Sequence, residues 1–154
     1  MIETERAFLV RGRIPDGLKK MINQAYLLAI PGLTVRLRTV DAGSGECTVK
    51  LGRGRRRLEV GLPFPASAAA AFIKRSSRVV RKTRTQVGPW EFDDYEQPKF
   101  PPGVFRAELE GDYPLGGGLP PLPDSLSHII EVTGTEEFSN AALACTGFPA
   151  QMPK

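Results

Sequence analysis

The sequence predicts a mainly β protein of the α+β class, in which antiparallel strands are accompanied by a few flanking helices. Roughly eight short segments alternate apolar and polar residues, a pattern typical of strands. Turns rich in glycine and proline, such as Pro31-Gly32 and Gly52-Arg53-Gly54, separate neighbouring segments. The polar positions of these segments are mainly arginine, lysine, glutamate and aspartate, and any fold has to accommodate this charge.

The first half of the chain is expected to form a meander of hairpins. Asp16, which precedes the stretch from Leu18 to Ile22, has the residue type of a helix N-cap, so we expect a short helix there. Strands are expected at residues 2–11, 24–29, 34–40, 47–51 and 56–62.

The second half combines strands with two helices. A helix is expected over residues 65–77, because Pro65 suits a first helical turn and the alanine run after it favours helix. Thr133 and Glu136 have the spacing of a capping box, which predicts a last helix that reaches about Ala144. Further strands are expected at residues 79–87, 90–95, 104–110 and 127–132.

Charged residues share one face of most predicted strands, because alternate side chains of a strand point to opposite sides of its sheet. An open antiparallel sheet with its polar face in water explains this alternation in any single strand. A sheet curled into a barrel, with charge inside and apolar residues outside under helices, explains all the strands together. The polar faces carry Glu3, Glu5, Arg36, Arg38, Thr48, Lys50, Arg57, Glu59, Lys82, Arg84, Glu91, Asp93, Arg106, Glu108 and Glu110.

Length and composition indicate one domain over residues 1–147, followed by a tail at residues 148–154. The net charge of +4 is compatible with an anionic partner. The only cysteines, Cys47 and Cys145, do not form a CxxC motif, so neither a zinc knuckle nor a redox pair is supported. Because no long apolar run occurs, we expect a cytoplasmic protein without a membrane partner. The oligomeric state stays open, with a homodimer among the alternatives.

Acids and bases that face one interior suit a metal–polyphosphate ligand. Arginine and lysine neutralise phosphate oxygens, whereas carboxylates repel phosphate unless a hard divalent cation lies between them. Mg²⁺ or Mn²⁺ takes oxygen ligands, and Mg²⁺ is often held by a few carboxylates together with substrate phosphates. The alternative is an internal salt-bridge network without a ligand, although buried ion pairs are weak evidence of stabilisation.

Short motifs at matching intervals carry a resemblance that extends over residues 2–144. They are Glu3-Thr4-Glu5-Arg6, Gln24-Ala25-Tyr26-Leu27, Val35-Arg36-Leu37-Arg38, Thr48-Val49-Lys50, Leu58-Glu59-Val60, Lys82-Thr83-Arg84, Trp90-Glu91-Phe92-Asp93, Ala107-Glu108-Leu109-Glu110 and Glu131-Val132-Thr133. Each motif is weak alone, but their number and order resemble the CYTH superfamily, the triphosphate tunnel metalloenzymes. The first motif is similar to the start of that superfamily's ExExK signature.

The resemblance implies a closed eight-stranded antiparallel β-barrel tunnel of the CYTH type that binds a triphosphate with Mg²⁺ or Mn²⁺. It implies a metal-dependent triphosphatase that hydrolyses the terminal phosphate of inorganic tripolyphosphate or of an organic or nucleoside triphosphate. Small bacterial members look like inorganic or generic triphosphatases. The implied metal ligands are Glu3, Glu5, Glu108, Glu110 and Asp93. The implied phosphate-binding residues are Arg36, Arg38, Lys50, Lys82 and Arg84, and the implied catalytic residues are Lys82, Glu59 and Tyr26.

One position departs from the signature, because Ala7 stands where the ExExK motif has its lysine. Arg6 does not replace that lysine, since adjacent strand residues face opposite ways. The departure leaves a catalytically impaired triphosphate-binding module as an alternative, and a class IV-type adenylyl cyclase is a second alternative.

A nucleic-acid partner is not expected. Arg53, Arg55, Arg56 and Arg57 surround a glycine turn and could contact a phosphate backbone, but no interleaved aromatic residues support that function. A solvated hairpin tip is the interpretation that we prefer for these arginines.

Overall fold

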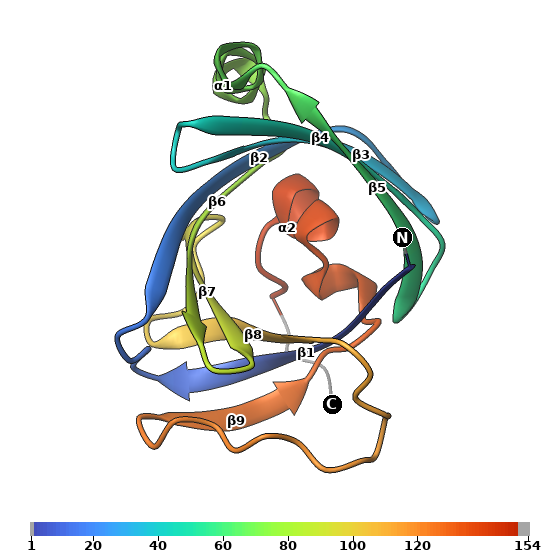
Figure 1. Ribbon diagram of the computed structural model, residues 1–154. Helices are drawn as coiled ribbons and strands as arrows, with labels where there is room; N and C mark the ends of the chain where they lie inside the picture. The colour runs from blue at the N-terminus through green and yellow to red at the C-terminus, as the bar shows by residue number, and fades with distance from the viewer. Residues whose placement is uncertain (1, 151–154) are drawn as a thin grey trace.

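The computed structural model describes residues 2–150, apart from the side chain of Glu3, and nine antiparallel strands dominate it. Eight of them, in the order β5-β4-β3-β2-β6-β7-β8-β1, close into a barrel because β5 also pairs with β1 (Figure 1). The strands are β1 (Ile2–Gly12), β2 (Leu18–Ile30), β3 (Leu33–Val40), β4 (Ser44–Leu51), β5 (Arg56–Phe64), β6 (Val79–Val87), β7 (Trp90–Gln97), β8 (Val104–Glu110) and β9 (Leu126–Glu131). The mainly β fold and its closed eight-stranded barrel are confirmed.

Strand β1 is shared among three partners. One edge pairs with β8 from Glu5 to Arg11. The other edge pairs with β5 at Ile2 to Thr4 and then with β9 from Phe8 to Gly12. The ninth strand, expected at residues 127–132, therefore extends the sheet outside the barrel. The sequence pattern did not predict this position.

The two α-helices occupy opposite sides of the barrel wall (Figure 1). Helix α1 (Ala66–Arg75) lies outside, where its Ile73 packs with Ala25 and Val79, and it confirms the helix expected after Pro65. The short 3₁₀ helix η1 (Glu136–Phe138) and α2 (Asn140–Thr146) lie inside. Leu143 of α2 packs against the inward-facing Val80 and Tyr95, so this helix fills part of the barrel interior.

The largest apolar core lies outside the barrel, on the outer faces of β1, β7 and β8. Strand β9 and the loop that precedes it cover this core, and the indole Nε1 of Trp90 donates to the carbonyl of Pro121 in that loop at 3.2 Å. Apolar outer faces were expected under helices, but here a strand and a loop cover them. The core comprises Phe8, Val10, Trp90, Phe92, Ala107, Leu109 and Leu126.

The prediction of a short helix after Asp16 is wrong, because the segment from Leu18 belongs to β2. Residues Lys20, Ile22 and Gln24 lie on one face of this strand, which pairs with β6 on one edge and with β3 on the other. Two flanking strands satisfy the backbone groups of this segment, and such tertiary pairing outweighs a local capping signal.

The helix expected to reach about Ala144 is confirmed as α2, but the prediction that a capping box at Thr133 begins it is wrong. Thr133 donates to the carboxylate of Glu131 and accepts from the backbone N–H of Ala7, while Gly134 has a φ of 68°. Helix α2 begins after Ser139, whose Oγ accepts from the backbone N–H of Ala142 at 3.1 Å.

The expected tail is packed at its start, since the ring of Phe148 lies 4.7 Å from that of Phe100 and 5.7 Å from that of Phe138. Residues 151–154 of that tail lie outside the described part of the chain. None of the helices described has the length and apolar character that a bilayer span requires.

Candidate active site

The charged faces of the strands meet in one cavity of about 590 Å³ inside the barrel. Ten of the twelve residues that the sequence predicts for the site line this cavity, namely Glu5, Tyr26, Arg36, Arg38, Lys50, Glu59, Lys82, Arg84, Glu108 and Glu110. The strand alternation thus places them on a common inner surface. Which of them bind metal, bind phosphate or act in catalysis stays a prediction.

The other two predicted residues differ from this group. Asp93 is fully buried behind the cavity surface and does not line it. The side chain of Glu3 lies outside the described residues, although its backbone pairs with Arg57 in β5.

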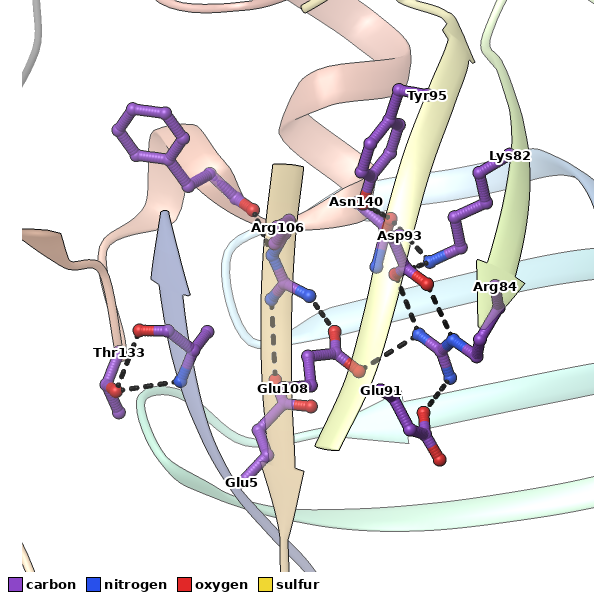
Figure 2. Close-up of polar contacts among 12 residues, drawn as sticks. Glu5, Lys82, Arg84, Glu91, Asp93, Tyr95, Arg106, Glu108, Thr133 and Asn140 are labelled. Carbon is purple, nitrogen blue, oxygen red and sulfur yellow. Dashed lines mark hydrogen bonds and ion pairs between the residues drawn. The ribbon is translucent and has the colours of Figure 1, made fainter. Parts of the chain in front are cut away.

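Short ion pairs connect the inner faces of β6, β7 and β8, and we call this surface the paired wall (Figure 2). Arg84 makes a bidentate pair with Asp93, with Nε–Oδ1 at 2.7 Å and Nη2–Oδ2 at 2.8 Å. The same guanidinium reaches Glu91 at 2.5 Å and Glu108 at 3.0 Å. The ammonium of Lys82 also contacts Asp93, at 2.6 Å. The paired wall consists of Lys82, Arg84, Glu91, Asp93 and Glu108.

The carboxylate of Asp93 is a structural centre of the paired wall. Burial acts to raise its pKa, but Arg84 and Lys82 outweigh burial and hold the pKa of Asp93 well below its ordinary value. Both of its oxygens are engaged by cations. This arrangement favours a role in positioning Lys82 and Arg84 over the predicted role as a metal ligand.

The buried ammonium of Lys82 is the second cation of the paired wall, and its pKa is lowered, unlike that of Arg84. Burial lowers its pKa well below the ordinary value, and the positive charges of Arg84 and Arg106 act in the same direction against the attraction of Asp93. Its Nζ also donates to Oδ1 of Asn140 at 3.2 Å, and that oxygen accepts from the hydroxyl of Tyr95 at 2.7 Å. Helix α2 therefore completes the surroundings of Lys82 from inside the barrel.

On the opposite side of the cavity, the inner faces of β3, β4 and β5 carry looser ion pairs, and we call this surface the basic wall. Arg36 and Lys50 lie 3.9 Å and 3.6 Å from the carboxylate of Glu59, and Arg38 lies 3.3 Å from that of Glu46. Burial and the nearby charge of Arg36 lower the pKa of Arg38. The basic wall consists of Arg36, Arg38, Lys50, Glu46 and Glu59.

Tyr26 lies next to the basic wall in a polar cluster. Its hydroxyl accepts from Nε2 of Gln24 at 3.1 Å, and the Oε1 of Gln24 accepts from Arg36 at 3.5 Å. Burial raises the pKa of Tyr26, so the phenol keeps its proton and can donate a hydrogen bond into the cavity.

The carboxylates of Glu5, Glu108 and Glu110 have the chemistry of a hard-cation site. Glu5 and Glu110 are register partners on β1 and β8, and all three line the cavity. Among the described side chains, however, no three potential ligands are grouped closely enough to hold a metal as they stand. Oxygens of a bound phosphate would have to complete such a site, as they commonly do for Mg²⁺.

Arginines already neutralise two of these carboxylates. Arg57 contacts Glu5 at 2.5 Å, and Arg106 pairs with Glu108. Burial acts to raise the pKa of Glu5, but Arg106 and Arg57 outweigh it and lower that pKa, so the carboxylate stays ionised. A cation bound here would compete with both guanidinium groups.

Four residues of the site were missed as functional candidates. Arg57, Glu91 and Arg106 share the inner strand faces with predicted residues, so the alternation itself could have identified them. Asn140 could not be found this way, because it comes from a helix whose place inside the barrel depends on tertiary packing.

The arginine-rich turn between β4 and β5 is only partly solvated. Arg57 points to Glu5, Arg55 donates to the carbonyl of Tyr113, and both line the cavity together with Arg53. Arg56 is exposed. The interpretation of all four as a solvated hairpin tip is therefore wrong for Arg55 and Arg57.

Comparisons with known proteins point to the same barrel. No protein-family model matches the chain, and no curated protein sequence matches it significantly. The inorganic triphosphatase NE1496 is similar with a TM-score of 0.64 and 24% identity, over 94% of this chain and 98% of that one. A second structure of NE1496, described as a hypothetical protein, gives a TM-score of 0.59 and 25% identity, over 96% and 99% of the two chains.

A third similar structure is the PH1012 protein from Pyrococcus horikoshii OT3. It has a TM-score of 0.50 and 17% identity, over 75% of this chain and 82% of that one. These likenesses and the closed eight-stranded barrel confirm the sequence resemblance at the level of the fold, and this chain has a CYTH-like barrel.

Proposed function

We propose that this protein is a metal-dependent triphosphatase that hydrolyses the terminal phosphate of inorganic tripolyphosphate or of an organic or nucleoside triphosphate. One observation carries the proposal: five bases from two opposite walls converge on a single cavity, which further basic residues and several carboxylates also line. The fold shared with NE1496, which is described as an inorganic triphosphatase, supports it.

The two walls suit different parts of a triphosphate. Arg36, Arg38 and Lys50 hold its phosphates from the basic wall, where all three side chains line the cavity. Lys82 and Arg84 face them from the paired wall, in positions that Asp93 fixes. A polyanion held between basic side chains of two opposite surfaces gains both charge neutralisation and orientation.

Glu5, Glu108 and Glu110 are the residues that would hold Mg²⁺ or Mn²⁺ together with phosphate oxygens. The bound ion would offset negative charge on the phosphate that is transferred. A metal bound at Glu5 would displace the guanidinium of Arg57, which would then turn towards the polyanion.

The three predicted catalytic residues have separate roles in this proposal. Lys82, paired with Asp93, donates from its ammonium to an oxygen of the phosphate that is attacked. Glu59 lies between Arg36 and Lys50 and orients the water, while Tyr26 donates its phenolic proton to an oxygen in the cavity.

The test is the release of orthophosphate from tripolyphosphate and ATP, with Mg²⁺ or Mn²⁺ and with a chelator. We expect metal-dependent release by the wild type, loss of release in Lys82→Gln, and unchanged release in the matched control Arg81→Gln, which removes the neighbouring charge from outside the cavity. Absence of orthophosphate with Mg²⁺, Mn²⁺ and Co²⁺ would overturn hydrolysis. Pyrophosphate and cyclic AMP formed from ATP would identify a cyclase.

A second candidate is a triphosphate-binding module without turnover. The pairing of Glu5 and Glu108 with arginines favours it, because occupied carboxylates bind a metal less readily. Calorimetric binding of tripolyphosphate by a protein that releases no orthophosphate would establish this function in place of hydrolysis.

A further inference from the structure

Arg106 is a buried cation that faces the cavity from β8, beside the position where β1 carries Ala7. Ala7 is the register partner of Glu108, and Leu9 is the partner of Arg106, so all four lie on the inner face of the β1–β8 pair. The guanidinium of Arg106 lines the cavity although its side chain is only 5% exposed.

The direction of the Arg106 side chain depends on the small residue at position 7. Arg106 lies opposite Leu9, yet its Nη2 comes within 3.9 Å of the carboxylate of Glu5, four residues along β1. Four strand residues span about 13 Å, so the side chains of Arg106 and Glu5 must extend towards each other along the β1–β8 pair, past the level of Ala7 and Glu108. A long side chain at position 7 would occupy that path.

Two contacts fix the guanidinium there (Figure 2). Its Nε donates to the backbone carbonyl of Phe138 at 3.1 Å, and its Nη1 pairs with Glu108. The Nη2 atom, at 3.9 Å from Glu5, is beyond hydrogen-bond distance. Because a guanidinium carries five N–H donors, these contacts leave donors for an anion in the cavity.

We propose that Arg106 is a phosphate-binding residue that supplies from β8 the cation that β1 lacks at position 7. This inference rests on the proposed function and adds a specific residue to it. Ala7 and Arg106 then form a matched pair, in which the alanine leaves room for the arginine and the arginine provides the charge. Ala7 is on this view no sign of an impaired site.

The test measures the tripolyphosphate dissociation constant by calorimetry in a chelating buffer, where neither turnover nor metal binding contributes. We expect Arg106→Leu to weaken binding by about 10- to 100-fold, the effect of losing a charge-assisted hydrogen bond. Arg81→Leu removes one charge from outside the cavity and should change binding by less than about 2-fold at 0.15 M salt, where distant charges are screened.

The double variant Ala7→Lys with Arg106→Leu separates a charge role from a purely structural one. It should restore binding to within about 3-fold of the wild type, because a lysine on β1 then takes over the cation. Ala7→Lys alone should not improve binding, since the lysine would meet Arg106. Unfolding by urea shows whether each variant is folded, and if Arg106→Leu does not fold, Arg106→Gln carries the same comparison.

The outcomes separate this inference from the proposed function. A wild type that binds tripolyphosphate together with a folded Arg106→Leu that binds it equally well would overturn the role of Arg106 and leave the function standing. A double variant that binds as weakly as Arg106→Leu would also overturn it. A wild type that neither binds nor hydrolyses tripolyphosphate, with or without metal, would overturn both.

Discussion

The paired wall and the basic wall face the same cavity but hold their charges in different ways. On the paired wall, the contacts of Arg84 and Lys82 with carboxylates are 2.5–3.0 Å long, and Asp93 at their centre has no exposure to solvent. On the basic wall, the ion pairs are 3.3–3.9 Å long, and the carboxylate side chains are 25% and 39% exposed.

This difference indicates a division between a fixed surface and an exchangeable one. A buried ion pair is costly to break because the partner left behind is an uncompensated charge. A long, partly solvated pair contributes little and can be replaced by contacts with a ligand. We therefore expect substitutions on the paired wall to affect stability first, and substitutions on the basic wall to affect binding first.

The largest effect is expected from Asp93→Asn on the paired wall. The variant leaves the buried Lys82 without the carboxylate of Asp93 and Arg84 with only Glu91 and Glu108, and the free energy of unfolding should fall by about 3–5 kcal/mol in urea denaturation. Asp94→Asn is the matched control, because Asp94 is the exposed neighbour on the same strand and should change stability by less than about 0.5 kcal/mol. A loss below about 1 kcal/mol in Asp93→Asn would contradict the idea of a fixed wall.

A smaller effect, on binding, is expected from Arg36→Gln on the basic wall. Loss of a charged donor to phosphate should weaken tripolyphosphate binding by about 1.5–3 kcal/mol in calorimetry, and folding should lose less than in Asp93→Asn, because Glu59 keeps Lys50 as a partner. Arg56→Gln removes the same charge from an exposed position and should bind normally. The division between the walls fails if Arg36→Gln unfolds more readily than Asp93→Asn.

The smallest effect is expected from pH. The pKa of Asp93 is lowered in the folded state, so the unfolded state takes up the proton first as the pH falls. Its contribution to stability is fully present above the unfolded pKa of about 3.9 and decreases below it, by about 1 kcal/mol at pH 3. Urea unfolding from pH 6 to pH 3 should show this additional decrease in the wild type relative to Asp93→Asn. Parallel curves for the two proteins would contradict it.

Strand alternation allowed much of the site to be predicted, because it is a local property that the barrel preserves. Arg36 and Arg38 on β3, or Glu108 and Glu110 on β8, point inward for the same reason that their apolar neighbours point outward. The same rule applies to Arg106, which the motif comparison passed over because its significance depends on Ala7 in the neighbouring strand.

The features that escaped prediction depend on contacts between distant segments. Asp16 has the residue type of a helix cap, but β3 and β6 turn the segment after it into a strand. Asn140 and the carbonyl of Phe138 enter the site only because η1 and α2 lie inside the barrel. The interior position of α2 follows from packing of Leu143 against Val80 and Tyr95, which no local pattern in the last segment indicates.

The position of β1 in the sheet has a consequence for how the chain reaches this state. Its partners β5, β8 and β9 all come later in the sequence, and the register of Glu5 with Glu110 joins segments that are about 105 residues apart. Contacts between such remote segments slow folding, because the entropy of closing a large loop is lost before the contacts form. During synthesis, β1 can therefore pair only after most of the chain has been made, and only then can the barrel close around α2.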